Sequence, residues 1–281
     1  MVKTVLTNSL LLLMTIGLTF SSGVFSLLLY SKMSGKEFWS VRNEMPPAPI
    51  AASLPPSTVP SLEPSVSTSA RAREKIPKAL LEAPIVRQNP ELPSGCEITA
   101  LTMLLQFYGV KKGKMELVPE MKKDPTEIVW NEDGTIQYWG NPNLGYVGDI
   151  TGKRKGFGIY HAALFELLEK YVPTAVDLTD NSFEELEQTV SDGIPVMVWT
   201  TIQFKAPSDN QWVIWDSPLG PIRTTFQEHT VLLVGYDQDH VYVNDPLSGK
   251  KAYPIPKKQF IESWEALGKQ ALTYTKPNNG A

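Results

Sequence analysis

The strongest helical pattern in the chain begins at Cys96. Apolar residues recur there at three- or four-residue spacing, at Ile98, Leu101, Leu105 and Tyr108. A Pro-Ser-Gly turn signal occupies residues 93–95 just before it, and Gly109 is a typical stop signal. The pattern therefore predicts a helix over residues 96–108 with Cys96 at its amino end.

Later parts of the chain predict further helices and then strands. A second helix is expected over residues 160–171, and a third from Ser182, which has Glu185 three residues on as in a capping box, to residues 192–193. Strands are expected over 196–200, 229–236 and 241–244, with a loop over about 205–225 and a last short helix around Trp264. Helices followed by mainly antiparallel strands are typical of an α+β fold.

The N-terminal segment has the composition of a membrane span. No charged residue occurs from Thr4 to Leu29, and the stretch 10–29 is mostly apolar. About 20 apolar residues suffice to cross a bilayer as a helix. A cleaved signal peptide is the alternative, since residues 21–23 are small, but its apolar core is only about 7–15 residues long. The continuing apolar run favours an uncleaved signal anchor within residues 1–30.

A proline-rich segment separates this span from the rest of the chain. Seven prolines fall between Met45 and Pro64, with Ser, Ala and Thr between them. Such a composition cannot bury enough apolar surface to offset the entropy of ordering. The sequence thus predicts a disordered linker over 31–79 and a globular domain over 80–276.

Charge and cysteine content exclude several classes of protein. Residues 1–80 hold 8 Lys and Arg against 4 Asp and Glu, whereas residues 81–281 hold 18 against 26. The globular part therefore carries −8, which argues against a nucleic-acid partner. A single cysteine excludes an internal disulfide framework and any multi-cysteine cluster. No metal or other cofactor is expected.

Three residues form a candidate catalytic group. A helix amino terminus is expected to lower the pKa of the Cys96 thiol and so favour the nucleophilic thiolate. His229 opens an apolar strand, and Asp245 ends the next one. A thiol, an imidazole and a carboxylate that orients the imidazole are the parts of a cysteine hydrolase. His161 begins an expected helix, where a cationic side chain gains nothing from the dipole, and is expected to serve in packing or at the surface. His240 lies in a turn and is expected to be solvated. The spacings of Cys96 and the histidines match no zinc site.

Strand register decides how Asp245 meets His229. A four-residue loop at 237–240 would put Asp245 opposite Leu232, and a two-residue loop would put it opposite Thr230. A twist or bulge would then be needed to bring the carboxylate to the imidazole. Gln88, eight residues before Cys96, is a candidate donor to the oxyanion.

These segments resemble the bacteriocin-leader-peptidase-like family of cysteine peptidases in a stand-alone form without a transporter. The resemblance rests on residues 88–97 (QNPELPSGCE) with the helix that follows, 193–199 (GIPVMVW), 228–236 (EHTVLLVGY) and 243–246 (VNDP). It covers about residues 80–272. It implies a papain-like fold, a triad of Cys96, His229 and Asp245, and Gln88 as the oxyanion residue. Glu97 stands where the transporter-linked peptidases commonly carry glycine.

The sequence therefore predicts a bacterial cysteine peptidase that hydrolyses peptide or protein substrates. It is expected on the outer side of the cell membrane, held by a single span, or secreted if the N-terminal segment is cleaved. One alternative is a cell-wall peptide hydrolase of the NlpC type, with cell-wall polymer as a partner. The other is a catalytically idle module, in which a groove binds peptide or wall polymer and is lined by Trp199, Gln203, Gln211, Trp212 and Trp215.

Overall fold

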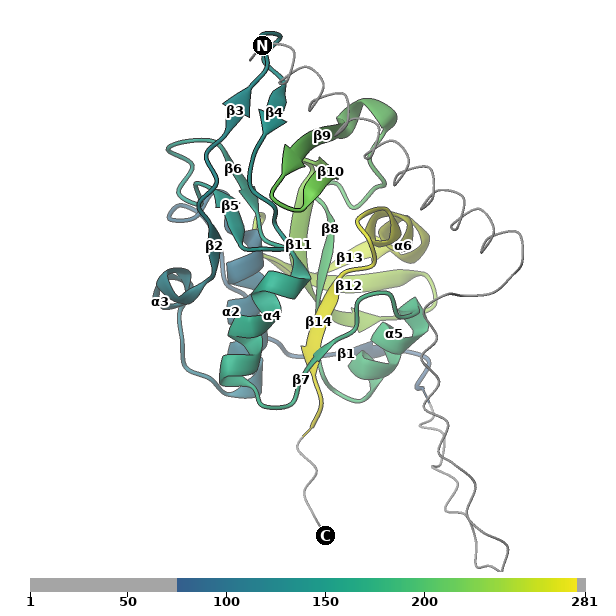
Figure 1. Cartoon of the computed structure of the whole chain (residues 1–281). Coiled ribbons are helices and arrows are strands. Elements are labelled where there is room, and N and C mark those ends of the chain that lie inside the picture. The colour runs from purple at the N-terminus through teal and green to yellow at the C-terminus, as the bar shows by residue number, and fades with distance from the viewer. Residues whose placement is uncertain (1–74, 277–281) are drawn as a thin grey trace, which may run out of the picture. The chain divides into compact units, whose positions relative to one another are not determined.

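The computed structural model describes residues 75–276 (Figure 1). The predicted anchor within 1–30 and residues 31–74 of the predicted linker lie outside the described residues. Within 75–276, no helix is both long and apolar enough to cross a membrane. Residues 75–79, which the sequence assigned to the linker, belong to the fold. The Lys75 ammonium lies 2.6 Å from the Glu187 carboxylate, and Ala79 pairs with Tyr236.

A seven-stranded sheet forms the centre of the domain. Its main path is β13 (Lys250–Pro256), β12 (His240–Asp245), β11 (Glu228–Tyr236), β8 (Val196–Thr201), β14 (Ala271–Tyr274) and β7 (Ala175–Asp177). The short strand β1 (Ala79–Leu80) also pairs with β11. All these pairings are antiparallel.

Helices cover both faces of this sheet (Figure 1). One face packs on α2 (Cys96–Tyr108) and α4 (His161–Tyr171), through sheet residues such as Leu232 and Trp199. The other packs on α5 (Phe183–Ser191) and α6 (Lys257–Ala266), through residues such as Val231 and Val198. Because neighbouring strand residues point to opposite faces, the inner strands β8, β11 and β14 contribute to both cores. The α+β class predicted from the sequence is confirmed.

The predicted helices form with the signals that the sequence carries. Helix α2 spans the predicted residues, and Gly109 ends it in a left-handed conformation with φ 111°. The Ser182 hydroxyl accepts the Glu185 amide at the start of α5. The described chain also contains the short helices α3 (Lys114–Leu117), η1 (Val118–Glu120) and η2 (Asp209–Gln211).

Two smaller sheets lie beside the central one. One is built from β10 (Gly220–Thr225), β9 (Trp212–Ser217), β4 (Ile136–Tyr138) and β3 (Val129–Trp130). The other contains β2 (Lys123–Asp124), β5 (Tyr146–Gly148) and β6 (Gly156–Gly158).

The prediction of a loop over about 205–225 is wrong, because β9 and β10 form a hairpin there. Its apolar residues do not alternate with polar ones. Trp215 is buried while Ile214 on the opposite face is 63% exposed, so the period-two signal of a strand is lost. Pro221 within β10 weakens the signal further.

Candidate active site

Cys96 is the first residue of α2, and its side chain is almost buried. The preceding Gly95 makes this entry possible, because a Cβ atom there would lie 2.6 Å from the Leu92 Cβ. The Gly95 carbonyl accepts both the amide and the hydroxyl of Thr99, which fixes the first turn of the helix. The only thiol of the chain is therefore held at a helix start, as predicted.

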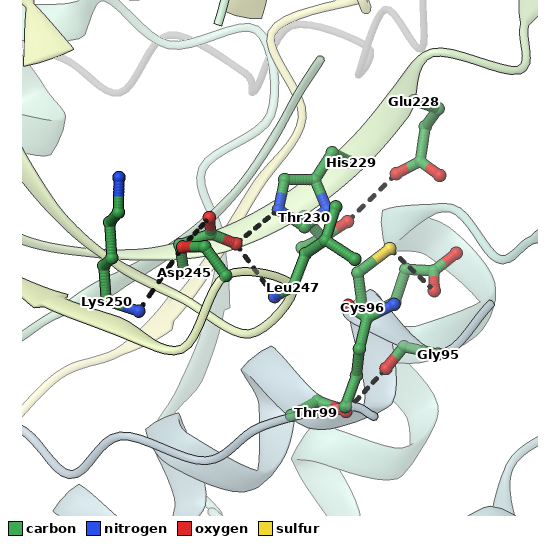
Figure 2. A network of polar contacts seen from close by, with 12 residues as sticks. Gly95, Cys96, Thr99, Glu228, His229, Thr230, Asp245, Leu247 and Lys250 are labelled. Carbon is green, nitrogen blue, oxygen red and sulfur yellow. Dashed lines mark hydrogen bonds and ion pairs between the residues drawn. The ribbon is translucent and has the colours of Figure 1, made fainter. Parts of the chain in front are cut away.

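His229 and Asp245 form a buried hydrogen-bonded pair. His229 Nε2 lies 2.7 Å from Asp245 Oδ1, and the two residues are 2% and 5% exposed. In the view of Figure 2 the imidazole lies between the Asp245 carboxylate and the Cys96 side chain. Strand β11 supplies the histidine, the end of β12 supplies the aspartate, and α2 supplies the cysteine.

Neither register that the sequence predicted would form this pair directly. Residues directly opposite each other on antiparallel strands point to the same face of a sheet, and neighbours along a strand point to opposite faces. Asp245 opposite Leu232, or opposite Thr230, would therefore emerge on the face away from His229.

A β-bulge in β11 corrects the register by one residue. The pairing shifts between Leu233 and Gly235, so that Leu232 faces Asn244. Continuing this register puts Asp245 beside Val231, on the same face as His229. An extra residue that the partner strand does not match thus aims the carboxylate at the imidazole.

The surroundings of Asp245 keep it ionised. Burial is the largest single influence and raises its pKa, but its interactions with neighbouring groups, the hydrogen bond to His229 first among them, together outweigh burial. Hydrogen bonds from the Ser248 hydroxyl and the Leu247 amide add to the effect of His229, and the pKa of Asp245 lies at about 2. An ionised carboxylate only accepts hydrogen bonds, so Nε2 of His229 must carry a proton. Nδ1 of the neutral ring is then the atom able to accept one.

The Cys96 thiol is held in a neutral state, contrary to the prediction from its helix position. Sγ lies 3.4 Å from Glu97 Oε2, to which it donates, whereas no hydrogen bond joins it to His229 within residues 75–276. Burial raises the thiol pKa well above its ordinary value, and the nearby Glu97 and Glu228 carboxyls add to the increase. The Thr230 amide has the opposite effect, but a smaller one. Desolvation and negative charge therefore outweigh the helix dipole.

Glu97 and Glu228 are site residues that the prediction missed. Ligand-type atoms of Cys96, Glu97 and Glu228 lie within 4.8 Å of one another, and all three residues are buried. The sequence did carry a signal for Glu97, because it stands beside the cysteine where the transporter-linked peptidases commonly carry glycine. Glu228 carried none, because only the fold brings the start of β11 against the start of α2.

Gln88 is hydrogen-bonded both to the residue after Asp245 and to the loop before Cys96. Its backbone amide donates to Pro246 O at 2.9 Å, next to Asp245, and its side-chain Nε2 donates to Pro93 O at 2.8 Å. The side chain is buried, and its Oε1 has no hydrogen-bond partner. Among the described residues no hydrogen bond links this amide to Cys96.

The other histidines sit in separate pairs. His161 Nδ1 lies 2.7 Å from Asp177, and His240 Nδ1 lies 3.6 Å from Asp237. In the described part of the chain, the one group of three or more metal-ligating side chains is that of Cys96, and it contains no histidine.

Two of the tryptophans that the binding-module alternative would place in a groove belong to the core. Trp199 and Trp215 are 0% and 1% exposed, and their indole N–H groups donate to the carbonyls of Ile159 and Gly140, each at 3.0 Å. These two residues therefore occupy core positions and are not available to line a groove.

A cavity of about 490 Å³ lies beside the loop that leads into Cys96. Tyr146, which helps line it, donates to Ser94 O at 2.6 Å. Ile150, another lining residue, would lie 3.3 Å from a Cβ atom at Gly95. The cavity thus directly adjoins the loop that leads into Cys96.

Comparisons with known proteins agree with the resemblance described above. The model of the Peptidase C39-like family matches residues 80–272. The uncharacterized protein YvpB of Bacillus subtilis strain 168 is 35% identical over 188 residues, which is 66% of this chain and 71% of YvpB. A crystal structure described as that of a candidate C39-like peptidase from Bacillus anthracis is 40% identical, with a TM-score of 0.65. The match covers 71% of this chain and 98% of the Bacillus anthracis chain. The chain therefore belongs to the Peptidase C39-like family of cysteine peptidases.

Proposed function

We propose that this protein is a cysteine peptidase with a papain-like arrangement of Cys96, His229 and Asp245. The observation that carries the proposal is the 2.7 Å hydrogen bond between His229 Nε2 and Asp245, next to the chain's only thiol. Family membership supports the same reaction class and a peptide or protein substrate.

In the proposed mechanism Cys96 Sγ attacks the carbonyl carbon of a peptide bond. His229 Nδ1 takes the thiol proton and later gives it to the leaving amine. Asp245 holds the ring in the tautomer with the proton on Nε2 and stabilises the imidazolium that forms. Water then hydrolyses the thioester, and the thiol is restored.

Digestion of an unbiased peptide library tests the proposal. The full-length chain should cleave a subset of peptides, and Cys96→Ala should cleave none while keeping the same melting temperature. Purified peptidoglycan is the second substrate. Release of wall peptides without cleavage in the library would favour the NlpC-type alternative. Equal cleavage by Cys96→Ala and by the unmodified chain would contradict the proposal.

One observation favours the idle binding module as a second candidate. The thiol is buried, its pKa is raised, and it is bonded to Glu97 instead of His229. The burial of Trp199 and Trp215 argues against the groove that such a module would use. An unchanged cellular phenotype of Cys96→Ala would support this candidate.

Gln88 is proposed as a side-chain donor to the oxyanion, together with the Cys96 backbone N–H. One N–H of its amide is committed to Pro93 O, which leaves the second available to a bound substrate. Gln88→Ala is expected to lower kcat by about 10²- to 10³-fold with little change in KM.

The matched control for this prediction is Gln106→Ala. The Gln106 amide also donates to a backbone carbonyl, that of Lys112 at 3.0 Å, but at the far end of α2. It should leave kcat unchanged. A loss of less than about threefold in Gln88→Ala would remove Gln88 from the oxyanion site.

We also propose that a helix within residues 1–30 anchors the domain at the outer side of a bacterial cell membrane, with residues 31–74 as the spacer. The support is the uncharged apolar run from Thr4 to Leu29 and the prolines that follow it.

A further inference from the structure

The residue after the candidate nucleophile holds the thiol through its side chain. The Glu97 carboxyl accepts the Cys96 thiol on Oε2 at 3.4 Å and the Ile159 amide on Oε1 at 2.8 Å. Glu97 is 0% exposed. Both of its oxygens therefore act as acceptors, which suits the ionised carboxylate.

Neighbouring groups leave this carboxylate without a positive partner. Glu228 faces it from β11, with its Oε1 accepting the Thr230 hydroxyl at 3.0 Å. Tyr146 of β5 and Tyr160 before α4 are the other titratable groups nearby, and their hydroxyls bond Ser94 and Thr224. No lysine, arginine or histidine within residues 75–276 forms an ion pair with Glu97 or Glu228.

The fold makes room for the two carboxyls at Gly158. A Cβ atom there would lie 2.1 Å from Glu97 Oε1 and 3.2 Å from Glu228 Oε2. Strand β6 can therefore pack closely against the two carboxyl groups, because Gly158 has no side chain. The arrangement fixes the Glu97 carboxylate against the thiol and keeps solvent from it.

Burial raises the pKa of Glu97 to about 7, despite hydrogen bonds that favour its ionised form. Burial raises the pKa of Glu228 well above its usual range, and the charge of Glu97 raises it further. Two carboxylates this close in a desolvated site cannot both ionise easily. Glu97 therefore ionises first, near neutral pH, while Glu228 keeps its proton.

We propose that Glu97 is a positioning residue for the nucleophile. Its carboxylate holds Cys96 as a neutral thiol bonded away from His229, and uptake of a proton by Glu97 releases the thiol to transfer its proton to His229 Nδ1. This inference rests on the proposed function, because it assigns Cys96 and His229 the roles of nucleophile and base. The protonated carboxyl is a donor, so it can also stabilise the thiolate that results.

The sign of the pH effect follows from the raised pKa of Glu97. Below about pH 7 the protonated form dominates and the thiol is released. Above it the carboxylate forms, and each further pH unit removes about nine tenths of the released population. Glutamine is a neutral mimic of the protonated acid that still accepts the Ile159 amide. Glu97→Gln should therefore stay in the released state at every pH.

The test is the rate of Cys96 alkylation by iodoacetamide in the full-length chain, which requires no peptidase activity. The ratio of the Glu97→Gln rate to the wild-type rate should be near one at about pH 6 and about tenfold at about pH 8. Glu187→Gln is the matched control. Glu187 is also buried, but it pairs with Lys75 and Lys257, and its ratio should stay the same at both pH values.

A ratio for Glu97→Gln that is equal at both pH values would overturn the inference, since a merely structural change shifts both rates alike. Glu228→Gln provides a second variant should Glu97→Gln not fold. Glu228 keeps its proton when Glu97 ionises, so this variant should track the wild-type pH profile. Loss of the wild-type profile in Glu228→Gln would equally overturn the role of Glu97. If the alkylation ratio is as predicted but no peptide is cleaved, the result would contradict the proposed function and leave the role of Glu97 in place.

Discussion

Replacing His229 with alanine is expected to lower kcat/KM for a cleaved peptide by about 10³- to 10⁴-fold. The imidazole is the base that Asp245 orients on the side of the thiol, and general acid–base catalysis typically contributes about 10²- to 10⁴-fold. We place the effect at the upper end, because the thiol pKa is already raised by burial and by Glu97. A thiol that ionises with difficulty depends strongly on its base.

His161→Ala is the matched control for this loss. His161 is likewise hydrogen-bonded to an aspartate, with Nδ1 2.7 Å from Asp177, but it begins α4 instead of β11. Its replacement should leave kcat/KM unchanged. The measurement is steady-state cleavage of one peptide by the wild-type chain, His229→Ala and His161→Ala. The melting temperature of each protein shows whether it is folded. Equal activity of His229→Ala and the unmodified chain would exclude His229 as the base.

Asp245→Asn is expected to lower both activity and stability, and the stability loss should depend on pH. The amide can donate to Nε2 and so favour the wrong tautomer, which should cost at least about 10²-fold in kcat. The pKa of Asp245 in the folded state is about 2, below its ordinary value of 3.8. A carboxyl with a depressed pKa stabilises the fold above the unfolded pKa, here by about 2 kcal/mol.

That contribution should vanish as the pH falls from about 4 towards 2. Chemical denaturation of the wild-type chain and Asp245→Asn at neutral and acid pH measures the difference directly. Asp237→Asn is the control, since the pKa of Asp237 is also about 2 but its partners are Tyr242 and His240. It should change the acid stability without changing kcat. An unchanged kcat in Asp245→Asn would contradict the role of Asp245 in the triad.

Local signals explain what the sequence could predict of the fold. Helix α2 has its start at a Gly turn, its apolar spacing and its Gly109 stop within fifteen residues, and its bounds are as predicted. The β9–β10 hairpin could not be predicted in the same way, since Trp215 and Ile214 show no alternation of apolar and polar residues.

In the candidate site, too, local signals predicted some features, while others depend on the fold. Cys96, His229 and Asp245 could be chosen from residue type and order, but their alignment depends on a bulge between Leu233 and Gly235 that no local pattern marks. The thiol pKa was predicted in the wrong direction. Its shift arises from burial, from the adjacent Glu97 and from Glu228. Burial and the approach of Glu228, which is 132 positions from Cys96 in the chain, depend on the fold and not on a local pattern.

The most direct test of the central claim is the intact mass of the full-length chain after exposure to an electrophilic peptide probe such as a peptidyl vinyl sulfone. We expect a single adduct on Cys96 in the wild-type chain and none in Cys96→Ala. In His229→Ala the adduct should form at least about tenfold more slowly, because the thiol then lacks the base that activates it. Equal, slow labelling of Cys96 in the wild-type chain and in His229→Ala would contradict an activated nucleophile.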